Sequence, residues 1–114
     1  MHEYSITEEI VNIVSKRAEE ENLRNVTEIT VVVGDRTGFI GDSIRLYFEV
    51  LSEGKICENA HIKIIPIKTQ FKCNSCRKNY EKTKNFLCPF CNSEGKPTKI
   101  GTEFYIKEIS GQKS

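Results

Sequence analysis

The sequence contains no run of about 18 apolar residues, the length that a helix needs to cross a bilayer. Residues 1–15 also lack the basic start and the uninterrupted apolar segment of a secretory signal peptide. Only two histidines are present, with no Ser-His-Asp pattern and no phosphate-binding loop. We therefore expect a reduced, cytoplasmic protein that has no membrane span and is not an enzyme.

The charge is divided unevenly along the 114 residues, although the net charge is only +1. Residues 68–99 contain eight basic and two acidic residues, a net charge of +6, whereas the remainder has nine basic and fourteen acidic residues, a net charge of −5. With 38% hydrophobic residues, the chain can form one modest core and a second, smaller unit that cannot fold without a metal. The sequence thus predicts two electrostatically different bodies.

Four cysteines define the smaller, metal-dependent unit. They follow the pattern Cys73-x2-Cys76-x11-Cys88-x2-Cys91, and two such short turns form a closed tetrahedral thiolate shell for a structural Zn²⁺ ion. Two disulfides are the alternative, and the expected reducing compartment argues against them. A closed shell leaves no position for substrate, so we expect a structural zinc ribbon rather than a catalytic metal. The fifth cysteine, Cys57, has no partner at metal-binding spacing and is interpreted as a packed thiol.

The remaining elements predict an α+β fold with two helices and a three-stranded sheet. The first helix is expected to begin at the capping box Ser5-Ile6-Thr7-Glu8, and the second to be capped by Asp42. Apolar periodicity and β-branched runs predict the following elements: helices over 5–22 and 42–52, and strands over 26–34, 61–67 and 101–109. The predicted domains are therefore an α/β body of residues 1–67 and 100–114 and an inserted zinc-binding domain of residues 68–99.

The basic zinc-binding segment has a second interpretation. Zinc ribbons are common in nucleic-acid-binding proteins, and basic and aromatic side chains are interspersed in this one: Lys72, Arg77, Lys78, Lys82 and Lys84 with Tyr80 and Phe86. The net charge of −5 on the remaining residues opposes docking on phosphates. We therefore keep a nucleic-acid-binding zinc ribbon as the alternative and expect no nucleic-acid partner.

The first three residues, Met1-His2-Glu3, predict a second metal site. Met1 should be retained, because the bulky His2 prevents its removal, so a free amine precedes an imidazole. Both groups lose protons near neutral pH. The amine, the backbone nitrogen and Nδ1 of His2 can form fused chelate rings in one plane, and Glu3 can supply a fourth ligand. Nitrogen-rich square-planar geometry selects Ni²⁺ or Cu²⁺.

Together these motifs resemble the HypA/HybF family of hydrogenase nickel-incorporation proteins. The resemblance covers the Met1-His2-Glu3 start, the strand ending at Gly34, the segment Ile44–Val50, the cysteine pairs and the closing Gly101–Phe104. It implies a nickel metallochaperone that delivers Ni²⁺ to the large subunit of [NiFe]-hydrogenase with the HypB GTPase as partner. Nickel would bind at the first three residues and zinc at the four cysteines.

The resemblance also implies one departure. Some family members add an acidic ligand from the loop before the second helix, and this chain has Ile40 at the corresponding position. Asp42 lies two residues further on and is expected to serve as the helix cap. A role in supplying urease occurs in some members only.

Overall fold

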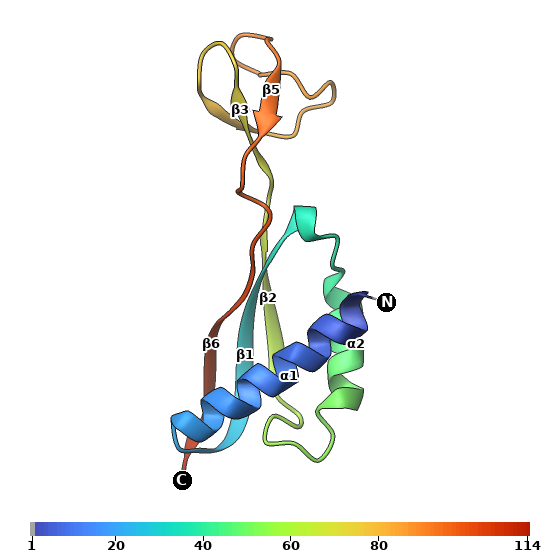
Figure 1. Ribbon diagram of the computed structural model, residues 1–114, viewed down its shortest axis with the longest axis vertical. Coiled ribbons are helices and arrows are strands. Elements are labelled where there is room, and N and C mark those ends of the chain that lie inside the picture. The colour runs from blue at the N-terminus through green and yellow to red at the C-terminus, as the bar shows by residue number, and fades with distance from the viewer. Residues whose placement is uncertain (1) are drawn as a thin grey trace. The chain divides into compact units, whose positions relative to one another are not determined.

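The computed structural model describes residues 2–114, except for the side chain of His2 (Figure 1). Two α-helices and six strands form an α+β fold, as the sequence predicts. The elements are α1 (His2–Glu20), β1 (Leu23–Gly34), the 3-10 turn η1 (Asp35–Thr37), α2 (Gly41–Leu51), β2 (His61–Ile67), β3 (Gln70–Cys73), β4 (Asn79–Glu81), β5 (Gly95–Pro97) and β6 (Phe104–Lys113). The strands form two three-stranded sheets, with the orders β2-β1-β6 and β4-β3-β5.

The chain divides into two compact units. The first, called the body, extends through Val32 and includes Phe39–Ile65 and Tyr105–Ser114; the second, called the lobe, comprises Val33–Gly38 and Pro66–Phe104. The lobe is thus broader than the cysteine-containing segment alone. Within residues 2–114, no helix combines the length and the apolar character that a membrane span requires.

The body has an apolar core to which both helices and all three strands of its sheet contribute. Helix α1 packs against α2. Fully or almost fully buried side chains come from every element: Ile10, Val14 and Ala18 of α1, Val26, Ile29 and Val31 of β1, Ile44 and Phe48 of α2, Ile62 of β2 and Ile106 of β6. Because these residues recur at helical or strand spacing, the apolar pattern correctly predicts the buried faces.

Helix α1 begins earlier than predicted. It starts at His2, so Ser5 lies inside the helix and the expected capping box is wrong. A contact that the local sequence pattern does not reveal stabilises the first turn of α1. Tyr4 packs edge-on against Tyr47 of α2, with ring centroids 5.5 Å apart. The hydroxyl of Thr7 donates to the carbonyl of Glu3. Tertiary packing therefore extends the helix past its local start signal.

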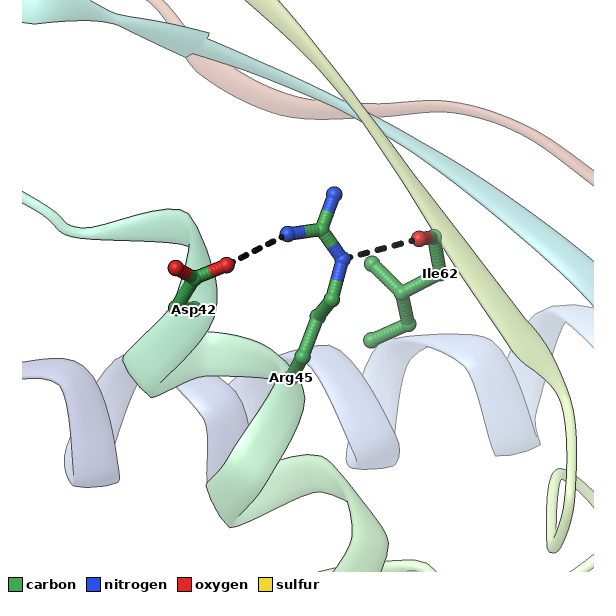
Figure 2. A network of polar contacts seen from close by, with 3 residues as sticks. All are labelled: Asp42, Arg45 and Ile62. Atoms are coloured by element: carbon green, nitrogen blue, oxygen red, sulfur yellow. Dashed lines mark hydrogen bonds and ion pairs between the residues drawn. The ribbon is translucent and has the colours of Figure 1, made fainter.

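Asp42 does not cap α2, contrary to the prediction. The N-cap is Ile40, whose own side chain makes no capping hydrogen bond. The Asp42 carboxylate instead pairs with Arg45, whose Nη1 lies 3.0 Å from Oδ1 (Figure 2). Arg45 Nε also lies 3.5 Å from the carbonyl oxygen of Ile62 in β2. The carboxylate thus orients an arginine that links α2 to the sheet.

The last strand begins later and ends later than predicted. Residues before Phe104 form a turn in which Thr102 donates its N–H to Lys99, and Gly101 adopts a φ of 110°. Gly34 donates its N–H to the carbonyl of Glu103 over 2.7 Å, and a Cβ at Gly34 would lie 2.1 Å from the carbonyl oxygen of Gly101. Only glycine permits this close backbone approach, so the turn replaces the start of the predicted strand.

Candidate metal centres

The lobe is built around strand β3, which ends at Cys73. Strand β3 pairs antiparallel with β4 and with β5, so that Phe71 lies opposite Tyr80 and Cys73 lies opposite Gly95. The lobe core has few buried residues: Cys73, Tyr80 and Cys88, with Phe71 and Cys76 packed against them. Two of these three buried side chains are cysteines, so the sulfur centre and the lobe core are the same structure.

The two C-x2-C turns have matching backbone geometry. Cys73 donates its N–H to the carbonyl of Lys78 at 3.0 Å, and Cys88 donates equivalently to Ser93 at 2.9 Å. In each turn, the N–H two residues after the first cysteine also points at its sulfur, from Ser75 at 3.3 Å and from Phe90 at 3.4 Å. Such N–H···S contacts stabilise thiolates. Each turn is therefore arranged to present ionised sulfur.

The four sulfurs converge from both turns to one point. They lie within 4.8 Å of one another, with Cys73 3.3 Å from Cys91 and Cys76 3.7 Å from Cys88. Zinc–sulfur bonds of about 2.3 Å in a tetrahedron place sulfurs about 3.8 Å apart. All four are free thiols rather than disulfides, since a disulfide bond is only about 2.05 Å long. The donor set thus fits one tetrahedral metal ion.

The same arrangement separates the pKa values of the thiols. Hydrogen bonds from Ser93 lower the pKa of Cys91 to about 6, and the Cys76 N–H lowers that of Cys73. The backbone of Lys78 acts to lower the pKa of Cys76, but burial and the neighbouring cysteines outweigh it and raise this pKa to about 11. Four close sulfurs ionise in turn because each charge opposes the next. A bound cation removes this opposition.

Cys57 lies outside this centre. It is fully buried in the body, and burial raises the pKa of its thiol. This confirms its interpretation as a packed thiol.

The predicted N-terminal site is described only in part. Met1 and the side chain of His2 lie outside the described residues. Glu3 is half-buried, and its Oε2 accepts a hydrogen bond from the backbone N–H of Ile40 at 3.3 Å. Glu3 therefore connects the first turn of α1 to the residue that precedes α2. The sequence carries no signal for this contact, because the donor is a backbone group distant along the chain.

Ile40, from the sequence analysis, and His61, the second histidine of the chain, have no metal-binding arrangement. Ile40 is 60% exposed and offers no side-chain ligand. His61 is an exposed residue at the start of β2, as its strand position predicts. Among the side chains of residues 3–114, the four cysteines are the group close enough together to hold a metal.

Comparison with known proteins identifies the family of this chain. The family model described as "Hydrogenase/urease nickel incorporation, metallochaperone, hypA" matches residues 1–111. The chain belongs to the HypA family. A hydrogenase maturation factor HypA from Caldanaerobacter subterraneus is 37% identical over 111 residues, covering 96% of this chain and 97% of the relative. The HypA of Aquifex aeolicus is 30% identical over 96% of both chains.

Solved structures agree with the HypA fold. A solution structure of HypA protein matches with a TM-score of 0.72 at 20% identity, covering 100% of this chain and 98% of the other. The solution structure of the Ni metallochaperone HypA from Helicobacter pylori matches with a TM-score of 0.66 at 19% identity, covering 98% of each. This protein is therefore a nickel metallochaperone of hydrogenase maturation rather than an enzyme.

Proposed function

We propose that this HypA protein carries Ni²⁺ on its N-terminal residues and delivers it in the cytoplasm to the large subunit of [NiFe]-hydrogenase, in company with a HypB-type GTPase. The observation that carries this proposal is the match to a nickel-incorporation family over residues 1–111, which includes the Met1-His2-Glu3 start. Nickel is the cargo, and the four cysteines hold a separate, resident metal.

The resident metal is Zn²⁺ in this proposal, held by Cys73, Cys76, Cys88 and Cys91. Four thiolates at tetrahedral spacing suit Zn²⁺. Its filled d shell imposes no other coordination geometry. Zinc would supply the lobe with structural cross-linking and no open coordination position. The nickel cargo therefore binds at the other candidate site, formed by the first three residues.

The cargo ligands are the α-amine of Met1, the backbone nitrogen and Nδ1 of His2, and Glu3. Amine and imidazole nitrogens bind Ni²⁺ strongly when deprotonated, and both release protons near neutral pH. A chain terminus is open to an incoming ligand, which a delivery protein requires. The Glu3 carboxylate contact with Ile40 keeps the first turn of α1 close to α2. Nickel is thus bound at an accessible but anchored end.

The decisive experiment is a calorimetric nickel titration of the protein with its native terminus beside one carrying an N-terminal tag. The tag removes the free amine next to His2, so we expect the tagged protein to lose tight nickel binding. His2→Ala should show the same loss, whereas His61→Ala is the matched histidine control and should bind normally. Equal tight binding by native and tagged protein would refute the ligand set.

Protonation provides a second test of the same ligands. We expect nickel affinity to fall between about pH 7.5 and about pH 5.5, because protons compete for the amine and the imidazole. Titrations at the two pH values check this expectation, and unchanged affinity would contradict it. Delivery is tested by adding apo large subunit and GTPase to nickel-loaded protein and measuring nickel transferred, with His2→Ala as the negative control.

A further inference from the structure

The lobe contains a cleft that the metal centres do not use. It encloses about 360 Å³ and is lined by residues from separated segments of the lobe: Asp35, Arg36, Thr69, Phe71, Lys82 and Phe86. Phe71 forms part of its wall and is anchored by stacking on Tyr80, with ring centroids 5.5 Å apart. Phe86 lies edge-on to Phe71 at 6.3 Å. The cleft therefore has a preformed aromatic wall.

Phe86 is held in a conformation that its own side chain disfavours. Its φ is 62°, in the left-handed region, and 52% of the residue is exposed. The loop maintains this geometry through two hydrogen bonds, from Tyr80 Oη to the Phe86 carbonyl at 3.0 Å and from the Phe86 N–H to Thr83 at 3.1 Å. Glycine would adopt this backbone without strain. Strained residues of this kind cluster at ligand-binding positions.

Cations flank the aromatic wall. Lys82 Nζ lies 5.3 Å from the centre of the Phe86 ring, and Arg36 donates to the Thr98 carbonyl at 2.8 Å, which fixes its guanidinium. The only carboxylate lining the cleft, Asp35, is already bonded to the N–H and hydroxyl of Thr69. Residues 68–99 together have a net charge of +6, which four thiolates with one divalent ion reduce to about +4. The cleft thus combines apolar walls with a positive environment.

We propose that this cleft docks an acidic protein segment carrying one large apolar side chain, which packs on the wall formed by Phe71 and Phe86 while flanking carboxylates meet Lys82 and Arg36. Apolar walls favour an apolar side chain over a phosphate, so an acidic protein segment fits the cleft better than a nucleic-acid backbone. None of the cleft residues is a proposed nickel ligand, so this proposal stands or falls separately from nickel binding.

The test is a ¹⁵N NMR titration of the zinc-loaded full chain with a blocked peptide, Glu-Asp-Ala-Phe-Glu-Asp. We expect saturable shifts at Lys82, Phe86 and Arg36, and weaker binding of Glu-Asp-Ala-Ala-Glu-Asp. Lys82→Gln should lower affinity about three-fold or more and Phe86→Gly about ten-fold. Lys78→Gln is the matched control. Lys78 does not line the cleft, and its Nζ lies 4.9 Å from the centre of the Phe90 ring. The variant should bind with wild-type affinity.

Stability separates docking from a structural role. Phe86→Gly should leave hydrogen-exchange protection of the lobe unchanged, because loss of ring contacts is offset by relief of the left-handed strain. Asn92→Gly, at a φ of 62° in the same lobe, controls for the added glycine and should retain binding. Reduced lobe protection in Phe86→Gly would assign the ring a structural role and overturn the proposal.

Three other results would also overturn it: no cleft shifts with the peptide, tighter binding of a single-stranded oligonucleotide at the same residues, or self-association of the chain through them. Nickel titration of Phe86→Gly should match wild type. A failure of docking with normal nickel binding is therefore distinguishable from a failure of the proposed function.

Discussion

The body and the lobe are stabilised in different ways. The body buries apolar side chains from two helices and three strands, whereas the hydrophobic cluster around the sulfur centre of the lobe has three buried residues, Cys73, Tyr80 and Cys88. The body can fold through hydrophobic burial, because each of its helices and strands contributes buried apolar side chains. A core of three residues is too small for this, and convergence of four sulfurs must supply the remaining stability. One short chain thus combines a self-sufficient unit with a metal-dependent one.

Metal removal should separate the two units most strongly. Chelation of the resident metal, or Cys73→Ser, is expected to unfold the lobe, since structural zinc sites contribute apparent binding energies of about 10–16 kcal/mol. Amide signals of residues 70–97 should lose dispersion in ¹⁵N NMR spectra, while those of Ile10 and Ile29 in the body core persist. Cys57→Ser is the matched control and should retain the metal. A lobe that stays folded without metal would contradict the comparison.

Removal of a core side chain should have the converse effect. Ile44 is fully buried in α2, so Ile44→Ala is expected to lower the free energy of unfolding of the body by about 2–5 kcal/mol. Leu46→Ala on the same helix is the control, because Leu46 is 60% exposed and should change stability by no more than about 0.5 kcal/mol. Denaturant unfolding measures both. Release of the lobe metal by Ile44→Ala at native conditions would show that the units are not separable.

A methyl group at Gly95 should disturb the lobe alone. Its Cβ would lie 2.3 Å from the Tyr80 hydroxyl and 2.7 Å from the Lys72 carbonyl oxygen, so Gly95→Ala is expected to destabilise the lobe by about 1–3 kcal/mol. Competition with a chelator measures the weaker metal retention. At Gly41 in the body, the nearest contact of a Cβ is the flexible end of Ile64 at 3.0 Å. Gly41→Ala should therefore leave metal retention unchanged, and an equal loss would argue against local strain.

Acid should affect the sulfur centre before it affects Asp35. Hydrogen bonds from Thr69 hold the pKa of Asp35 below its ordinary value of 3.8. The Asp35 contribution to lobe stability is therefore present above pH 3.8 and is lost only as the pH falls below it. Protonation of the thiolates weakens metal binding. It occurs at a higher pH than protonation of Asp35.

Asp35→Asn tests this order of events and should give the smallest effect. We expect faster exchange of the Thr69 amide at neutral pH and an unchanged midpoint of acid-induced metal release. Hydrogen exchange and a metal-release titration measure the two quantities. Thr69→Val, which removes the hydroxyl donor, should likewise leave the midpoint unchanged. A shifted midpoint in Asp35→Asn would show that Asp35 titrates with the metal centre.

The sequence predicts buried faces and the cysteine pattern well because both depend on local spacing. Ile10, Val14 and Ile44 lie at helical intervals, and each C-x2-C turn forms from adjacent residues. The start of α1 and both helix caps are predicted wrongly, although α2 begins within one residue of its expected start. Ser5 and Asp42 have the right local chemistry for caps, but the Tyr4–Tyr47 contact and the Asp42–Arg45 pair determine where these residues lie.

The sequence by itself determined the class of fold, the composition of the sulfur centre and the family resemblance, because these depend on residue identity and short-range spacing. Tertiary structure alone decided that Glu3 bonds to the N–H of Ile40, and that Phe71 and Phe86 form one wall of a cleft flanked by Lys82 and Arg36. These contacts join segments separated along the chain and, in the first case, use a backbone donor. No residue pattern records such partners, because folding selects them through packing and hydrogen-bond geometry.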